Sequence, residues 1–236
     1  MSIVIPTWEA NGVGHKVIKY AFTSLEKQTF KDFEVVVSDQ SVDNLTEEVC
    51  EQWKDRLNIV YTREEKRRGY FTANENNGIK HCSGEIIKFL DADDYLYDWK
   101  SLEIINDAFT DNVNWLATDY LHSHDRTSLY NRHRPVMNER IYIVNSIGTP
   151  SCLAVRNVPD LPLFDEELKW AGDCEWYKRL YDKFGNPKIV SRTTIVHLLW
   201  NNNVEKVLTD EDLRKKEETY ILNKHEPKEI KIEETA

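Results

Sequence analysis

The chain has 236 residues, of which 40% are hydrophobic and 31% charged, so it is long enough to bury a core as one large globular domain. Its formal net charge is −10, and no block rich in Lys or Arg stands out, which excludes a general nucleic-acid binder with a basic groove. The four cysteines lack CxxC spacing, so we expect a protein without disulfides. The first residues do not resemble a signal peptide, and no run of about 18 apolar residues occurs. We therefore expect a cytoplasmic protein without membrane spans, with peripheral contact at the inner face of a membrane as an open alternative.

Apolar runs and amphipathic segments alternate along the first half of the chain. The β-branched runs predict strands, and the segments between them carry apolar residues at helical spacing. The expected strands are 2–6, 33–39, 58–62 and 85–91, and the expected helices are 15–28, 46–57 and 74–81. This alternation predicts an α/β fold with a parallel sheet covered on both faces. In such sheets ligands bind beyond the carboxyl ends of the strands.

The second half is less regular. We expect a strand at 112–120, a return to β structure over 141–157, a helix over 173–184 and a last strand at 188–198. The polar stretch 122–134 is expected to be a solvated loop, and contact with a phosphate of the acceptor is the alternative. Beyond Glu205 more than half of the residues are charged. This composition predicts either one solvated helix capped at Thr209 or a partly disordered tail.

Three aspartates follow the fourth expected strand directly: Asp91, Asp93 and Asp94. Carboxylate oxygens suit Mg²⁺ or Mn²⁺, and these ions also accept phosphate oxygens. A turn or helix cap is the competing interpretation, because Asp is common in both. The place directly after a buried strand favours the metal site.

Five segments resemble, in the same order, the glycosyltransferases of family two, which have the GT-A fold. They are SIVIPTWE, LEKQTFKDFE, VVVSDQSVDN, NENNGIK and GEIIKFLDADD. The resemblance implies a Rossmann-like, mostly parallel sheet flanked by helices in a single domain. It also implies inverting transfer from a nucleotide-diphosphate sugar to an acceptor hydroxyl, with Mn²⁺ or Mg²⁺ as cofactor.

The resemblance also implies a division of the chain and a set of site residues. Residues 1–204 would form the transferase domain, with a nucleotide-binding half at 1–97, an acceptor-binding half at 98–204 and a charged helix or tail at 205–236. The residues implied at the nucleotide sugar are Pro6, Thr7, Glu9, Asp39, Asn76, Asp91 and Ala92. Asp93 would coordinate the metal directly, Asp91 would contact the ribose or a metal-bound water, and Asp94 would hold the loop.

Two departures from the family pattern leave the base of the donor open among UDP, GDP and dTDP. Trp8-Glu9 replaces Tyr-Asn, and Ser38-Asp39-Gln40 replaces Asp-Asp-Gly. One carboxylate that is usual at the second place is therefore missing.

The segment LPLFDEELKWAGDCEWYKRL resembles the part of the family that supplies the catalytic base. Asp173 falls on the acidic position, and a helix N-cap is its alternative role. Glu175 is the rival base. Two residues on a helix are about 200° apart, so both carboxylates can hardly face one pocket.

His197 follows the last expected strand and resembles the family histidine that completes metal coordination; an ordinary structural histidine is the alternative. Trp170, Trp176 and Trp200 could stack on a sugar, although aromatic residues in such numbers usually belong to the core.

Two other functions compete with sugar transfer. A sugar-phosphate nucleotidyltransferase should carry a dense Gly-rich basic loop after its first strand, and PTWEANGVGHK lacks that pattern. A non-catalytic module that binds glycans or a partner would keep the fold without the reaction. Sugar transfer in polysaccharide or glycan assembly, to a glycan or lipid-linked acceptor, is the function that we expect.

Overall fold

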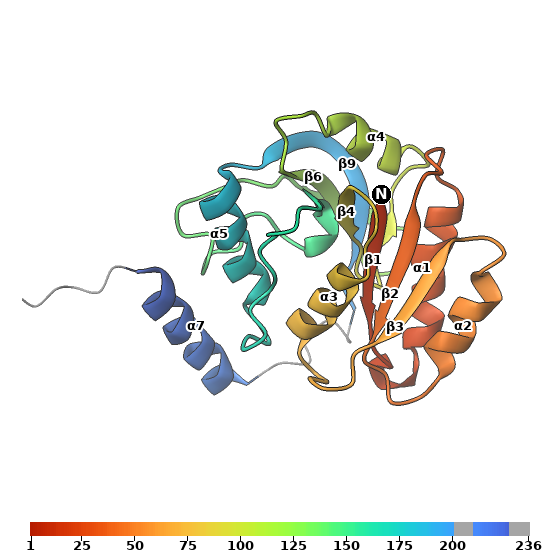
Figure 1. Ribbon diagram of the computed structural model, residues 1–236, viewed down its shortest axis with the longest axis horizontal. Coiled ribbons are helices and arrows are strands. Elements are labelled where there is room, and N and C mark those ends of the chain that lie inside the picture. The colour runs from red at the N-terminus through yellow and green to blue at the C-terminus, as the bar shows by residue number, and fades with distance from the viewer. Residues whose placement is uncertain (201–209, 227–236) are drawn as a thin grey trace, which may run out of the picture.

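A mixed sheet runs through the centre of the molecule (Figure 1). The structure is a computed structural model that describes residues 1–200 and 210–226. Within these residues the strands lie across the sheet in the order β3 (Ile59–Arg63), β2 (Glu34–Asp39), β1 (Ser2–Thr7), β4 (Ile86–Phe89), β8 (Leu153–Arg156), β6 (Trp115–Ser123), β9 (Lys188–Leu198) and β5 (Tyr95–Leu96), with β7 (Leu129–His133) paired to β6.

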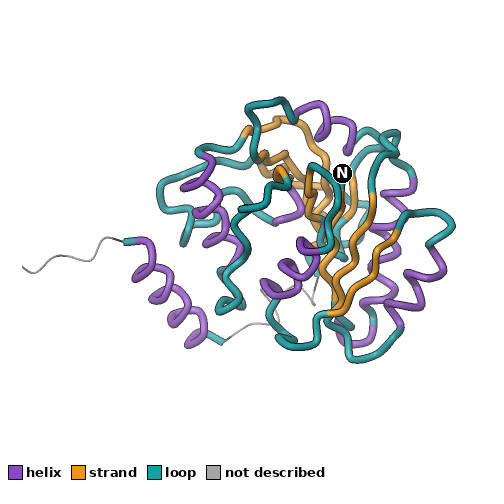
Figure 2. Tube along the Cα trace, in the orientation of Figure 1, coloured by secondary structure: helices purple, strands orange, loops and turns teal. Residues whose placement is uncertain are grey.

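Helices flank the sheet on both sides. They are α1 (Gly14–Glu26), α2 (Leu45–Trp53), α3 (Phe71–Lys80), α4 (Ser101–Ala108), α5 (Gly172–Phe184) and α7 (Glu211–His225), with short 3-10 turns η1 (Ala10–Gly12) and η2 (Pro150–Cys152). Helices α1 and α2 lie on one side of β1 to β3, and α3 lies on the other (Figures 1 and 2). In the described part of the chain, no helix has the length and apolar character needed to cross a membrane.

The first half of the sheet is parallel, as the alternating pattern predicts. Strands β3, β2, β1 and β4 pair in parallel, and the register sets Thr7 beside Asp39 and Asp39 beside Arg63. Beyond β4 the sheet becomes mixed, because β8 is antiparallel to both of its neighbours while β6 and β9 are parallel to each other. The α/β fold in a single domain is confirmed, and its parallel part is the N-terminal half.

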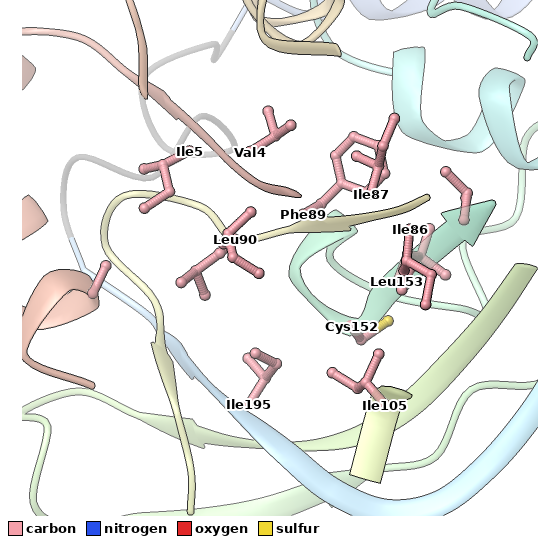
Figure 3. Packing of buried hydrophobic residues seen from close by; sticks show 14 of the residues in the cluster. Val4, Ile5, Ile86, Ile87, Phe89, Leu90, Ile105, Cys152, Leu153 and Ile195 are labelled. Atoms are coloured by element: carbon pink, nitrogen blue, oxygen red, sulfur yellow. The ribbon is translucent and has the colours of Figure 1, made fainter. Parts of the chain in front are cut away.

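The core lies around β1 and β4, whose apolar runs are buried on both faces, as is usual for central strands of parallel sheets. Val4 and Ile5 of β1 and Ile87 and Phe89 of β4 are fully buried, and Figure 3 shows them among the side chains of the core. Trp176 of α5 is also fully buried. Its ring stacks on Phe164 with centroids 4.2 Å apart, so it is a core residue.

The polar stretch 122–134 forms a hairpin, where the sequence predicts a loop. Strand β6 extends to Ser123 and pairs antiparallel with β7. Most side chains of β7 are exposed, so the segment lacks the alternation of apolar residues that marks a strand. Fully buried Asp119 of β6 pairs with Arg132 of β7 at 2.6 Å, which helps to hold the hairpin together.

The predicted return to β structure over 141–157 is wrong for most of its length. Only β8 is a strand there. Ile141 and Ile147 are fully buried, but turns rather than a strand carry them. Gly148 has a φ of 106°, which L side chains rarely adopt, and Pro150 begins η2. Apolar residues of this segment such as Ile141 and Ile147 are therefore buried without being extended.

Several helix ends differ from the expected ones. Helix α2 ends at Trp53, although the pattern continues to Leu57, which is buried in the turn that follows. Helix α3 begins at Phe71, three residues before the expected start. Helix α7 is capped by Asp210, whose side chain accepts hydrogen bonds from the N–H groups of Asp212 and Leu213. Thr209, the expected cap, lies outside the described residues.

Close packing of α3 on β1 predicts an effect of a single methyl group. A Cβ atom on Gly78 would lie 2.6 Å from Cγ1 of Val4, and both residues are buried. Overpacking costs about 1–3 kcal/mol, and the helix preference of Ala recovers roughly 1 kcal/mol at most. Because 2.6 Å is far inside van der Waals contact, the cost lies in the upper part of this range, and we expect Gly78→Ala to lower the free energy of unfolding by about 1–2 kcal/mol in chemical denaturation. Lys80→Ala, at an exposed position of the same helix, should stay within about 0.5 kcal/mol of wild type. Equal stabilities would contradict the close packing.

Candidate active site

The predicted nucleotide residues gather at the carboxyl ends of β1, β2 and β4. Thr7 is the last residue of β1, Asp39 is the last of β2, and Asp91 follows the end of β4. Because these strands are parallel neighbours, their ends share one edge of the sheet. This is the edge at which ligands bind in open α/β sheets.

The turn after β1 is held by its own backbone. Thr7 is buried, and its carbonyl accepts hydrogen bonds from Nδ2 of Asn74 and from the N–H of Gln40, both at 2.9 Å. The carbonyl of Glu9 accepts the N–H groups of Gly12, Val13 and Gly14. Pro6 and Glu9 are half-buried, so both remain accessible to a ligand.

Asp39 is fully buried and surrounded by donors. One carboxylate oxygen accepts from the N–H and hydroxyl of Ser41 at 2.8 and 2.6 Å, and the other accepts from the hydroxyl of Tyr61 at 2.8 Å. The guanidinium of Arg63 lies 3.9 Å away. Ser41, Tyr61 and Arg63 thus surround Asp39, and of these three no motif marks Tyr61.

Asn76 is engaged by the protein itself. Its side-chain amide donates to the carbonyl of Phe164 and to the carboxylate of Glu166, both at 2.9 Å, and its carbonyl accepts the N–H of Phe164 at 2.8 Å. These bonds tie α3 to the segment before α5. The expected contact between Asn76 and the nucleotide sugar stays a prediction.

The aspartates after β4 have different partners. Asp91 accepts from the hydroxyl of Thr149 at 2.8 Å, and Asp93 accepts from the indole N–H of Trp200 at 2.6 Å. Asp94 is fully buried and accepts from the N–H of Leu198 and from His197. Asp94 therefore fixes the loop to β9, as expected. Ala92 is half-buried and packs against the core.

Crowding of carboxylates affects the ionisation of this loop. Burial, together with the charges of Asp94 and Asp91, raises the pKa of Asp93 to about 7, and burial and Asp94 also raise the pKa of Asp91. Burial lowers the pKa of His197, but the charge of Asp94 and the hydrogen bond with it outweigh this and raise that pKa to about 9. Burial is the largest cause for both aspartates, the neighbouring carboxylates add to it, and His197 partly offsets it.

The carboxylate oxygens of Asp91 and Asp93 are ligands of the type that a hard divalent ion such as Mg²⁺ or Mn²⁺ prefers. Among the described residues, no three His, Cys, Asp or Glu side chains form a group able to hold a metal. Mg²⁺ is commonly held by only one or two carboxylates together with substrate phosphates, and the raised pKa values of Asp91 and Asp93 fit a site where a cation offsets negative charge. His197 binds Asp94 through Nδ1, so only its Nε2, in the neutral ring, could join as a ligand.

Asp173 and Glu175 lie in the first turn of α5 but have different surroundings. The carboxylate of Asp173 is half-buried and accepts from Nδ2 of Asn145 at 2.8 Å. Glu175 is fully buried and pairs with Arg179 at 3.0 Å, Lys224 at 2.7 Å and His225 at 3.2 Å. Arg179 of α5 and Lys224 and His225 of α7 therefore surround the Glu175 carboxylate.

A short turn links Asp173 to Asp91. Asn145 donates to Asp173 and accepts the N–H of Gly148 at 2.7 Å, and the hydroxyl of Thr149 donates to Asp91. The two carboxylates thus lie on either side of residues 145–149. Asn145 and Thr149 therefore orient these two carboxylates, and no motif in the sequence marks either residue.

Comparison with known proteins assigns the family. The sequence profile described as "Glycosyl transferase family 2" matches residues 2–156, more than half of the chain. The chain belongs to this family.

Two curated proteins are related over part of their length. A GalNAc(5)-diNAcBac-PP-undecaprenol beta-1,3-glucosyltransferase of Campylobacter jejuni is 35% identical over 97 residues, which are 41% of this chain and 30% of that protein. The poly(ribitol-phosphate) beta-N-acetylglucosaminyltransferase TarS of Staphylococcus aureus is 25% identical over 169 residues, 71% of this chain and 25% of TarS. The family 2 chain therefore spans less than a third of either relative.

Solved structures share the fold. The crystal structure of S. aureus TarS 1-349 superposes with a TM-score of 0.65 and 25% identity, covering 84% of this chain and 60% of that one. A mannosyltransferase from Pyrobaculum calidifontis, in complex with GDP-Man and Mn²⁺, gives a TM-score of 0.66 at 16% identity, covering 94% and 63%. The family 2 assignment and the architecture therefore agree.

Proposed function

We propose that this chain transfers a sugar from a nucleotide-diphosphate sugar to an acceptor hydroxyl, with inversion at the anomeric carbon. The observation that carries the proposal is the bridge formed by residues 145–149 between Asp91 and Asp173. It joins Asp91, a carboxylate beside the strand end suited to a diphosphate, to Asp173, a carboxylate in the first turn of α5. Inverting transfer needs a base on one side of the sugar and a group that stabilises the leaving diphosphate on the other side.

Asp173 acts as the general base in this proposal. Its carboxylate accepts the proton of the acceptor hydroxyl while that oxygen attacks the anomeric carbon, and the bond from this carbon to the diphosphate oxygen breaks. The nucleoside diphosphate leaves with the electron pair of that bond. Asn145 orients the carboxylate by its hydrogen bond at 2.8 Å. Glu175 is unsuited to the role because its buried carboxylate already pairs with the cationic side chains of Arg179 and Lys224.

The nucleotide binds, in the same proposal, to residues 1–97, and the acceptor binds to residues 98–204. Pro6, Thr7, Glu9 and Asp39 contact the nucleoside, and Asp93, with help from Asp91 and His197, would hold Mn²⁺ or Mg²⁺. When bound, the divalent ion offsets the charge that develops on the leaving diphosphate.

Donor and acceptor follow by analogy. TarS has been solved with UDP and with UDP-GlcNAc, and the P. calidifontis enzyme with GDP-Man and Mn²⁺. The names of the two curated relatives contain an undecaprenol diphosphate and a poly(ribitol-phosphate). We propose UDP, GDP or dTDP sugars as donors, and a glycan or lipid-linked acceptor in polysaccharide assembly at the cytoplasmic face of a membrane.

Metal-dependent binding of a nucleotide tests the proposal. We expect calorimetric titration to show binding of one among UDP, GDP and dTDP in Mn²⁺ or Mg²⁺ but not in EDTA. Asp93→Ala should reduce binding to the level seen in EDTA, because it removes the carboxylate proposed to hold the ion. Asp107→Ala, which removes an exposed carboxylate of α4, serves as control and should bind like wild type. The nucleotide that binds then selects the sugar donors for a transfer assay.

The outcome separates the competing functions. Release of nucleoside diphosphate together with a glycosylated acceptor supports the transferase. Binding of a nucleoside triphosphate and a sugar phosphate, with release of pyrophosphate, would instead indicate a nucleotidyltransferase. Absence of nucleotide binding under every condition would leave a non-catalytic binding module and overturn the proposal.

A further inference from the structure

Helix α7 docks beside the start of α5 through polar contacts. It lies next to α5 at the side of the molecule away from α1 and α2 (Figure 1). Of its residues only Glu217 and Ile221 are buried. A helix with so little apolar surface gains little from hydrophobic burial. Its position must therefore depend on specific hydrogen bonds and ion pairs.

Glu217 is the central contact. Its side chain is 4% exposed, and its carboxylate accepts hydrogen bonds from the backbone N–H groups of Lys169 at 2.7 Å, Trp170 at 2.9 Å and Ala171 at 3.0 Å. Successive N–H groups that converge in this way form an anion-binding nest. The nest directly precedes α5, whose N-terminal dipole also favours a negative charge. Glu217 supplies that charge from a segment 46 residues further along the chain.

A second set of contacts fixes the end of α7. Lys224 pairs with Asp165 at 2.6 Å and with Glu175 at 2.7 Å, and His225 lies 3.2 Å from Glu175. Tyr220 donates a hydrogen bond to Asp165 at 2.9 Å. Both ends of the segment 165–175 are therefore tied to α7.

Apolar contacts link α7 to the other side of Asp173. Fully buried Ile221 packs in one cluster with Tyr142, Leu168 and Ala171, and the ring of Tyr142 lies 5.5 Å from that of His225. Three residues after Tyr142 comes Asn145, which donates to Asp173. Helix α7 thus contacts both segments that determine where the Asp173 carboxylate lies.

We propose that Glu217 is a positioning residue for the transfer reaction: its carboxylate fixes the backbone of residues 169–171 and thereby the orientation of Asp173. The inference rests on the proposed function, in which Asp173 is the base. Only Gly172 separates Asp173 from the last N–H bound by Glu217. Glu217→Gln replaces one of the two accepting oxygens with an NH2 group that can only donate, so at least one of the three N–H groups loses its acceptor and the backbone must rearrange to satisfy it.

The test compares Glu217→Gln with Glu218→Gln in the full chain. The second variant removes the same charge from an exposed position of α7 and should behave as wild type. Glu217→Gln should lower kcat by roughly 10- to 100-fold, the effect of a small misplacement of a catalytic group. The donor KM and the affinity for the nucleotide should stay unchanged, because neither depends on the base. A merely structural role would lower the number of nucleotide-binding sites and the activity in equal proportion.

Two further measurements isolate the pathway through Asp173. In a chain that already carries Asp173→Asn, Glu217→Gln should reduce kcat by less than about twofold, since residues that act as a unit are not additive. An equal fractional loss in both backgrounds would overturn the proposal. Amide hydrogen exchange at residues 169–171 should be faster by about tenfold or more in Glu217→Gln than in Glu218→Gln; unchanged exchange would also overturn it. Amide exchange is measured without substrate. It therefore tests the contact between Glu217 and residues 169–171 even if the wild-type protein does not transfer sugar, so failure of this inference can be told apart from failure of the proposed function.

Discussion

Asp173→Asn is expected to remove nearly all sugar transfer while the protein folds and binds its nucleotide. An amide cannot take the proton of the acceptor hydroxyl, and general-base catalysis contributes about 10²- to 10⁴-fold to a rate. We expect kcat to fall by that factor. The side chain keeps its size and one oxygen, which can still accept from Nδ2 of Asn145. Nucleoside diphosphate release measures kcat, and calorimetry measures nucleotide affinity.

Asp182→Asn provides the matched control. Asp182 lies in the same helix, its side chain is 48% exposed, and among the described residues it pairs with Lys178 of the preceding turn. Exposed ion pairs contribute little to stability, so this variant should transfer sugar as wild type does. A kcat for Asp173→Asn within about threefold of wild type is far outside the range for a lost base and would exclude Asp173 from the role.

The parallel half of the fold was predictable because its signals are local. Central strands buried on both faces are continuous apolar runs, and β1, β2 and β4 lie within a residue or two of the expected bounds. The strand 188–198 agrees with β9 at both ends. Once these strands are parallel neighbours, their carboxyl ends must meet, so Thr7, Asp39 and Asp91 share one edge without any knowledge of loops.

The remaining errors arise where tertiary contacts outweigh the local pattern. Strand β7 is stabilised by pairing with β6 and by the ion pair between Arg132 and buried Asp119. Neither contact produces a periodic pattern of apolar residues in the sequence. The turn around Gly148 carries buried Ile147 without being extended. Hydrophobicity alone therefore reports burial there but not conformation.

The partners of the site residues depend on contacts between distant segments. Asn145 reaches Asp173 across 28 positions, Thr149 reaches Asp91 across 58, and Trp200 reaches Asp93 across 107. Asn145, Thr149 and Trp200 are residues of common types, and they stand at no fixed spacing in the sequence from the carboxylates that they contact. Motif resemblance can thus indicate the carboxylates, whereas the groups that orient them appear only in the structure.

Glu175→Gln should act on stability far more than on catalysis. Glu175 is fully buried, and its carboxylate is shared by Arg179 of α5 and by Lys224 and His225 of α7. Removing one partner of a buried pair costs about 3–5 kcal/mol. Lys224 is 33% and Arg179 28% exposed, so water recovers part of this cost. We expect the free energy of unfolding to fall by about 2–3 kcal/mol, and the melting temperature by about 4–12 °C.

Three comparisons test whether Glu175 acts on stability rather than on catalysis. Glu218→Gln removes an exposed charge of α7 and should stay within about 0.5 kcal/mol of wild type. Lys224→Met should destabilise as well, and the double variant should lose less than the sum of the two, because both changes break one pair. Well below the melting transition, kcat of Glu175→Gln should fall by less than about tenfold, since Glu217 still fixes residues 169–171. A loss as large as that of Asp173→Asn, in a protein that still binds its nucleotide, would make Glu175 the base instead.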